Sequence, residues 1–236
     1  MMRSTLTPEA QFGRIRALVA QVRSEHVRAL LFSFLDDPAI APLFLRAPAA
    51  NRIHHAFVGG LCEHTLSVLE LGWRICDHYP ELDRDLITAG CILHDLGKTR
   101  EISAEEGFSY TDEGELVGHL VLTCQLIHEK AAAIAGFPRE LEWHLTHLVV
   151  AHHGRREYGS PREPATLEAQ VLHALDELDT RVNSFGQIFA AAAPGAAWTE
   201  RDSMYRRRLF KGPSWNGELP ADARRLPEPG LYREGR

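Results

Sequence analysis

The 236-residue sequence lacks several features that mark special classes of protein. It has no run of about 18 apolar residues, so it offers no candidate transmembrane helix. Its first residues, Met1–Thr5, hold no apolar segment, and we therefore expect no secretory signal. Hydrophobic residues make up 44% of the chain and charged residues 25%, which is the balance of an ordinary globular protein. We expect a cytoplasmic protein with no membrane partner.

Paired cysteines and net positive charge are also missing. The four cysteines form no Cys-x-x-Cys motif, which argues against a structural zinc site, and we expect reduced core thiols. The formal net charge of −6 argues against a strongly basic nucleic-acid-binding protein. The charge is uneven, because residues 201–236 hold nine Lys/Arg against five Asp/Glu, which leaves −10 on residues 1–200.

The hydrophobic pattern that is present is mostly helical. Apolar spacing predicts helices over 8–22, 27–35, 62–78, 84–94, 115–135, 139–152 and 166–192. Residues 36–60 are expected to be irregular because prolines and a Gly-Gly pair interrupt them. Residues 99–114 suit a short hairpin with Gly107 in its turn. The predicted fold class is therefore all-α, a helical bundle with a small β-hairpin insertion.

The chain has 13 histidines, and four of them fall on the apolar stripe of a different predicted helix. These four are His64, His94, His119 and His152. A buried imidazole without a partner costs about 1–3 kcal/mol. One such residue is usually a satisfied core histidine, but a shared metal centre would satisfy all four together. Imidazole and carboxylate ligands without thiolate suit Mn²⁺, Fe²⁺, Co²⁺, Ni²⁺ or Zn²⁺.

The string from His94 to Lys98 reads His-Asp-Leu-Gly-Lys and adds a carboxylate and a cation. Asp95 has two oxygens and is able to bridge two metal ions. Lys98 suits a phosphate oxygen, although a cation that interacts with the helix dipole is the alternative. A second carboxylate is needed for charge balance, and spacing leaves Asp176 and Asp179 nearly tied.

These residues resemble the HD-domain metal-dependent phosphohydrolases. The late aspartate of that family belongs to an apolar-Asp-x-Leu string, which here is Leu175–Leu178 and favours Asp176. His119 within Gly118–Leu120 and the His152-His153-Gly154 string resemble the extra ligands of two-metal members, including the HD-GYP cyclic-dinucleotide phosphodiesterases. The GYP-type loop itself is absent from the sequence.

A longer series of strings resembles the HD domain of YhaM-type 3′–5′ exoribonucleases. It extends from about residue 25 to 211 and includes 47–50, 54–57, 59–61, 63–65, 94–98, 110–114, 152–154 and 158–161. Members of that group carry an N-terminal OB-fold nucleic-acid-binding domain. About 45 residues precede the first of these matching strings here, and their helical pattern cannot form such a barrel. We therefore expect weak binding of long RNA.

The resemblance implies one or two divalent metal ions and hydrolysis by a metal-bound hydroxide. The implied ligands are His64, His94, Asp95 and Asp176 for one ion, and Asp95, His119, His152 and His153 for the other. The implied catalytic residues are Asp95, Lys98, His54 and His55. The two loop histidines would contact substrate or protonate the leaving oxygen, and local hydrogen bonding is their alternative role.

The expected function is cleavage of phosphoester bonds in short single-stranded RNA, oligonucleotides or nucleotides. The alternative is a non-catalytic, nucleotide-binding regulatory HD module, against which the full ligand set and Lys98 argue. The expected organisation is a helical extension over 1–50, an HD domain over 51–192 and a partly disordered extension over 193–236. Arg206-Arg207-Arg208 is interpreted as a solvated cluster, with contact to a nucleic-acid backbone as the alternative. His173 is expected on the surface or side of a helix.

Overall fold

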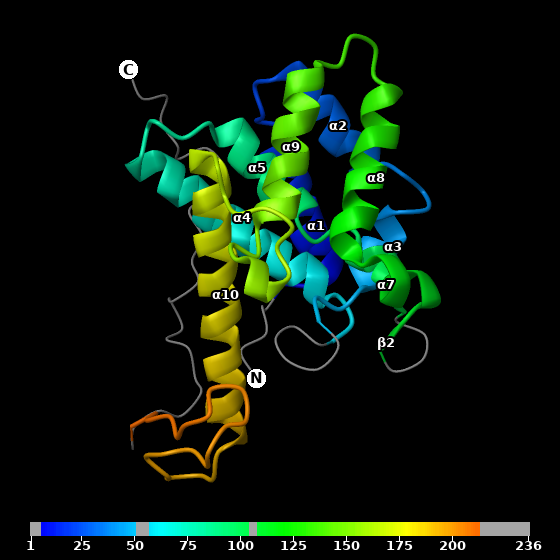
Figure 1. The fold of residues 1–236 in the computed structure, drawn as a ribbon. Coiled ribbons are helices and arrows are strands. Elements are labelled where there is room, and N and C mark those ends of the chain that lie inside the picture. The colour runs from blue at the N-terminus through cyan, green and yellow to red at the C-terminus, as the bar shows by residue number, and fades with distance from the viewer. Residues whose placement is uncertain (1–5, 51–56, 104–107, 213–236) are drawn as a thin grey trace. The chain divides into compact units, whose positions relative to one another are not determined.

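The computed structural model describes residues 6–50, 57–103 and 108–212 (Figure 1). The helices are α1 (Pro8–Val19), α2 (Glu25–Leu35), α3 (Ala41–Arg46), α4 (Gly60–His78), α5 (Arg84–Leu93), α6 (Lys98–Glu101), α7 (Asp112–Val117), α8 (His119–Ala132), α9 (Arg139–Ala151) and α10 (Leu167–Ala191), with a 3₁₀ turn at Arg156–Tyr158. Strands β1 (Ile102–Ser103) and β2 (Ser109–Tyr110) pair antiparallel. The predicted all-α class with a small β-hairpin is confirmed.

Three predicted segments differ from the structure. The hairpin predicted over 99–114 is shorter, because residues 98–101 form α6 and α7 begins at Asp112, while Gly107 lies outside the described residues. Helix α3 lies where an irregular segment was expected, because Pro42 occupies the first turn, where no helical N–H bond is lost. The predicted helix over 115–135 is two helices, since Gly118 has a φ of 77° that an α-helix does not continue. His119 therefore begins a new helix, and Leu116, expected one turn before it on the same face, is 85% exposed.

The chain divides into two compact units, and each is described by itself. Among the described residues, the first covers those from 6 to 183, and the second covers 184–212. In the first unit, α4 packs against α1, α3 and α5, while α5 also contacts α2 and α9. Helices α8 and α9 lie side by side and are joined by a short connection (Figure 1). No helix in the described ranges is long and apolar enough to cross a membrane.

Helix α4 approaches α5 closely because Gly72 has no side chain. A Cβ atom at Gly72 would lie 2.8 Å from Cγ2 of Ile87 and 3.3 Å from Sγ of Cys91. Leu61, Leu69 and neighbouring apolar side chains of α4 are fully buried along this contact. The close packing brings the histidines of α4 and α5 toward one another.

The connection from α5 to α6 packs closely against α8, and a glycine again allows the close approach. A Cβ atom at Gly97 would lie 2.2 Å from the carbonyl oxygen of His119 and 2.8 Å from Oγ1 of Thr123. The backbone N–H of Gly97 donates to that Oγ1 at 2.8 Å. This contact fixes the segment after Asp95 against the first turn of α8.

Gly97→Ala should therefore destabilise the protein by about 1–3 kcal/mol, because the added methyl group forces α8 away from residues 94–98. The free energy of unfolding, measured by urea denaturation, tests this. Gly13→Ala is the matched control, since Gly13 lies in α1 with nothing within 4 Å of its Cβ position. The control should be stabilised by about 0.5–1 kcal/mol. Equal effects of the two substitutions would contradict the assigned packing.

Candidate metal centre

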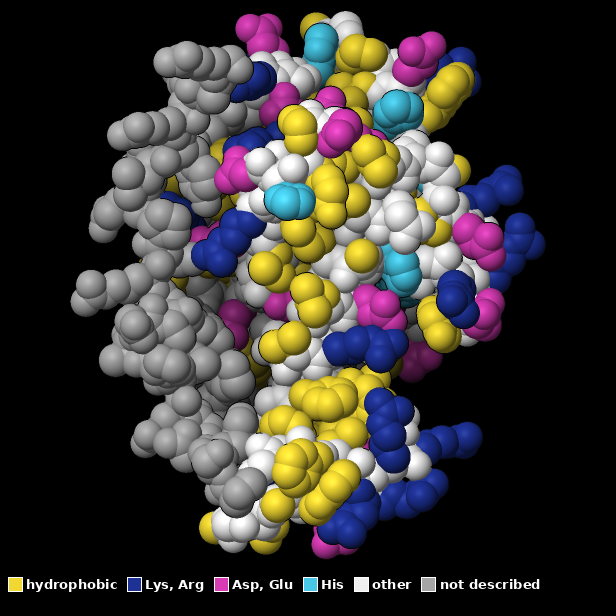
Figure 2. Space-filling model, turned by 90° about the vertical axis from the view of Figure 1, so that its left-hand side faces the viewer, with side chains coloured by type: hydrophobic (Ala, Val, Ile, Leu, Met, Phe, Trp, Pro, Cys, Tyr) yellow, Lys and Arg dark blue, Asp and Glu magenta, His cyan; other side chains and the backbone are white. Residues whose placement is uncertain are grey.

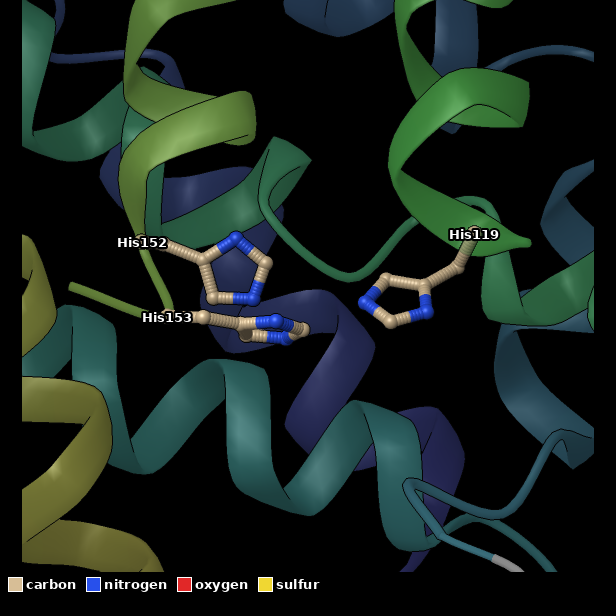
Figure 3. A group of neighbouring side chains, drawn as sticks. All are labelled: His119, His152 and His153. Atoms are coloured by element: carbon tan, nitrogen blue, oxygen red, sulfur yellow. The ribbon is translucent and has the colours of Figure 1, made fainter. Parts of the chain in front are cut away.

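Five helices bring the predicted ligand residues together within the first unit. The residues are His64 on α4, His94 and Asp95 after α5, His119 at the start of α8, His152 and His153 after α9, and Asp176 on α10. Figure 3 shows His119 directed toward His152 and His153 across the site. His54 and His55 lie outside the described residues.

One group of side chains surrounds the Nε2 atom of His64. This nitrogen lies 3.2 Å from Nε2 of His94 and 3.2 Å from Oδ1 of Asp176. Oδ2 of Asp95 lies 3.5 Å from Nε2 of His94 and 3.8 Å from Nε2 of His64. Two imidazoles and two carboxylates thus direct their polar atoms at one small volume.

A second group forms on the other side of Asp95. His119, His152 and His153 each offer a ring nitrogen, and these atoms lie within 4.8 Å of one another. Oδ1 of Asp95 lies 3.6 Å from Nε2 of His119 and 3.7 Å from Nε2 of His152. The two oxygens of one carboxylate therefore face two different sets of imidazoles.

Buried polar atoms in the second group have no hydrogen-bond partner among the described residues. Oδ1 of Asp95 and Nε2 of His119 are both in this state, and their separation of 3.6 Å is too long for a hydrogen bond between them. Leaving such atoms unsatisfied costs about 1–3 kcal/mol each. A divalent cation would satisfy both atoms, and a donor set of imidazole nitrogen and carboxylate oxygen fits such an ion.

Four histidines of the site, His64, His94, His119 and His152, each hold the Nδ1 atom in a separate contact. Nδ1 of His94 lies 3.1 Å from the carbonyl oxygen of Cys91, and Nδ1 of His152 lies 2.8 Å from that of Val149. The other two use carboxylates. Nδ1 is thereby occupied in these four rings, and Nε2 is left to face the centre, as in histidines that ligate metals. The buried Nδ1 of His153 has no hydrogen-bond partner among the described residues.

Asp179 is one of those carboxylates, and its position resolves the choice that spacing left open. Oδ2 of Asp179 lies 2.8 Å from Nδ1 of His64, on the side of the ring away from the centre. Asp176 faces Nε2 of the same ring. Ser67 donates to Oδ1 of Asp179, and the amide of Asn183 donates to its carbonyl oxygen at 3.0 Å. Asp176 thus lies on the side of the His64 ring that faces the centre, and Asp179 lies on the opposite side, so Asp176 stays the predicted ligand.

Glu101 is the other carboxylate, and the sequence pattern did not identify it. Its Oε1 atom lies 3.0 Å from Nδ1 of His119 and accepts the backbone N–H of His119 at 2.9 Å. In the expected hairpin this position was an ordinary strand residue. The residue is instead the last of α6, where its side chain caps the start of α8.

His173 was expected on the surface or side of a helix, and it lies half-buried on α10. Its Nδ1 atom lies 2.8 Å from the carbonyl oxygen of His152. A Cβ atom at Gly154 would lie 2.3 Å from the His173 ring, so the chain turns directly against it. The spacing of three residues from Asp176 was the available signal, because it places both side chains on one face of α10.

The electrostatics of the site keep its carboxylates charged. Burial favours a neutral Asp95, but Lys98 and the neighbouring imidazoles outweigh it and hold the pKa of Asp95 well below its usual range. The Nζ atom of Lys98 lies 2.7 Å from Oδ2 of Asp95. Burial raises the pKa of Asp176 as well, and its hydrogen bond to His64 more than reverses this.

The pKa shifts of the histidines differ between the two groups of side chains. Burial lowers the pKa of His64, but Asp176 and Asp179 raise it to about 10. Burial and the nearby His94 keep the pKa of His152 well below its usual value, and burial with His119 lowers the pKa of His153. Neutral imidazoles have a lone pair to offer a metal ion, so His152 and His153 are ready to bind one.

Known proteins match most of the chain. The family model described as HD domain matches residues 61–181. Relatives named 3′-5′ exoribonuclease YhaM are 35% identical over 211 residues in Shouchella clausii, 42% over 174 in Bacillus subtilis and 43% over 173 in Bacillus pumilus. These matches cover 89%, 73% and 73% of this chain, and 65%, 54% and 54% of the relatives. The chain thus spans about half to two thirds of each relative's length. No solved structure matches the chain significantly.

The buried contact between Asp179 and His64 should matter for stability. Asp179→Ala leaves His64 and Ser67 without this partner, and we expect a loss of about 3–5 kcal/mol in the free energy of unfolding. Asp77→Ala is the control, because the Asp77 side chain is 41% exposed in its pair with Arg84. It should cost less than about 1 kcal/mol. Guanidinium denaturation measures both, and similar losses would contradict the proposed burial of the His64 contact.

Proposed function

Because the chain belongs to the HD domain family, we propose that it is a divalent-metal-dependent phosphohydrolase. Its proposed substrates are phosphodiester bonds in RNA, short single-stranded oligonucleotides or nucleotides. The observation that carries this proposal is the buried Asp95, whose two oxygens face two separate groups of imidazoles. The names of the relatives support RNA as the substrate class.

The proposed ligand sets follow the two groups. One ion would be held by His64, His94, Asp95 and Asp176, and the other by Asp95, His119, His152 and His153. The absence of thiol ligands in these sets favours Mn²⁺, Fe²⁺, Co²⁺, Ni²⁺ or Zn²⁺. The four cysteines are unpaired, which supports a reducing compartment and hence a cytoplasmic location.

Bound divalent ions at such a centre supply a hydroxide nucleophile near neutral pH and withdraw negative charge from the phosphoryl oxygens. The residues of the chain prepare the centre for this chemistry. Glu101 and Asp179 hold the Nδ1 atoms of His119 and His64, so the Nε2 atoms point inward. Lys98 keeps Asp95 ionised, and its positive charge beside the centre is placed to offset charge on a phosphoryl group.

The non-catalytic alternative, a nucleotide-binding regulatory module, uses the same residues without turnover. The full ligand set and the adjacent Lys98 argue against it, because the positive charge of Lys98 can offset negative charge that develops on a phosphoryl group. We propose His54 and His55 as substrate-contacting residues on the strength of the family resemblance alone.

Asp95→Asn should abolish most activity, because one oxygen of the shared carboxylate becomes an amide nitrogen that cannot ligate a cation. Hydrolysis of bis(p-nitrophenyl) phosphate with Mn²⁺ should fall by more than about 100-fold. Metal analysis of the purified variant should show reduced metal content per chain. Asp77→Asn, at an exposed position, is the control. Undiminished hydrolysis by Asp95→Asn, or by wild type stripped of metal, would refute the proposal.

Glu101→Gln should act through His119 rather than remove a ligand. The amide still fits the space but is a weaker acceptor for the His119 ring, so the Mn²⁺ concentration that gives half-maximal activity should rise about 10–100-fold. The rate at saturating Mn²⁺ should fall much less. Glu115→Gln is the control, because Glu115 is exposed on the neighbouring α7. A fall in the saturating rate with unchanged metal dependence would assign Glu101 a different role.

A further inference from the structure

Aromatic side chains are exposed beside a cluster of arginines in the second unit. Trp198 is 48% exposed and Phe210 is 58% exposed, and their ring centroids lie 4.9 Å apart. Figure 2 shows hydrophobic and Lys/Arg side chains next to each other in the lower part of the view, which contains this segment. Contiguous exposed apolar surface, unlike a single exposed side chain, often marks a binding site.

The charge of this segment is opposite to that of the rest of the chain. Residues 193–212 contain five Lys/Arg and two Asp/Glu, whereas residues 1–200 carry −10. The guanidinium of Arg208 lies 5.7 Å from the centroid of the Trp198 ring, and that of Arg207 lies 5.6 Å from the centroid of Tyr205. Cations and aromatic faces are thus presented together, which is the combination that suits a polyanion with planar bases.

The segment is held in a defined conformation. Trp198 and Phe210 form an antiparallel bridge, and the backbone N–H of Thr199 donates to the carbonyl oxygen of Leu209 at 2.9 Å. Nε of Arg208 donates to the carbonyl oxygen of Thr199 at 3.1 Å. Arg206 adopts a φ of 53°, a left-handed conformation that is uncommon for a residue other than glycine. The rings and cations are therefore positioned before any ligand binds.

We propose that residues 197–211 form a docking surface for single-stranded nucleic acid. Bases would stack on the exposed parts of Trp198 and Phe210, and Arg206, Arg207 and Arg208 would contact the phosphates. This inference rests on the proposed function and names the polymer that its active site would cut. It takes up the alternative role of the three arginines, contact with a nucleic-acid backbone, because Arg208 lies beside the exposed ring of Trp198. Base stacking requires single strands, since the faces of paired bases are covered.

The test uses the full chain in EDTA, so that binding is measured without hydrolysis. The probe is a fluorescein-labelled oligoadenylate of about 12 nucleotides, within the usual range of site sizes, and the readout is anisotropy. The variants are Trp198→Ala, Trp198→Phe and Arg207→Gln. The matched controls are Trp143→Ala and Arg139→Gln, because Trp143 is 57% exposed and the Arg139 guanidinium lies 5.1 Å from its ring centroid on α9.

Trp198→Ala should weaken binding about tenfold, the effect of losing one stacked base, and Trp198→Phe should restore most of the affinity. Arg207→Gln should reduce the slope of log K against log salt by about 0.7, as expected for one lost phosphate contact on a single strand. Both control variants should bind like wild type. Circular dichroism checks that each variant is folded. If Trp198→Ala does not fold, Arg207→Gln still tests the proposal, because Arg207 is exposed.

Wild-type affinity in both Trp198→Ala and Arg207→Gln would overturn the proposal. A changed oligomeric state in these variants with unchanged RNA binding would also overturn it, and would identify the surface as a protein interface. Hydrolysis of bis(p-nitrophenyl) phosphate separates this inference from the proposed function. If wild type hydrolyses no ester with any of the metals while the variants lose RNA binding, the docking surface stands and the enzymatic proposal fails.

Discussion

One buried carboxylate, Asp95, governs the arrangement of the first unit. Its two oxygens face different imidazole groups, so helices α4, α5, α8, α9 and α10 must all end or pass near it. A charge at this depth is tolerated only with compensating partners, and Lys98 supplies one at 2.7 Å. The glycines at 72 and 97 allow the backbones to approach closely enough for this convergence.

The supporting contacts around the histidines explain why so many polar groups are stable in a core. The Nδ1 atoms of His64, His94, His119 and His152 are each paired with a carbonyl or a carboxylate, so the inward-facing Nε2 atoms of these four rings remain for another partner. Glu101 performs two tasks with one oxygen, since it orients His119 and accepts the first N–H of α8. The position of the ring and the start of the helix are therefore fixed by the same interaction.

Local periodicity predicted the fold class and four of the histidines that converge, whereas the choice of Asp176 and the full ligand set came from the family resemblance. His64, His94 and His152 were found from the apolar stripes they share, which survive in the packed helices. Spacing could not choose between Asp176 and Asp179, since both lie on one face of α10 and the choice depends on which ring nitrogen each meets. Glu101 was missed because its partner lies 18 residues away and no local pattern links the two. The break at Gly118 was readable in principle, as a glycine between two short apolar runs.

The distribution of charge separates recognition of the phosphoryl group from affinity for a long polymer. A centre built from imidazoles, carboxylates and one lysine recognises a phosphoryl group. It discriminates little between short and long chains attached to that group. Residues 1–200 have a net charge of −10, which repels a long polyanion at distances beyond direct contact. Affinity for a polymer must then come from a cationic segment with planar surfaces, and residues 197–211 combine both properties. Catalytic chemistry and polymer affinity are thus assigned to different residues, so that substitutions in one set can alter one property while leaving the other measurable.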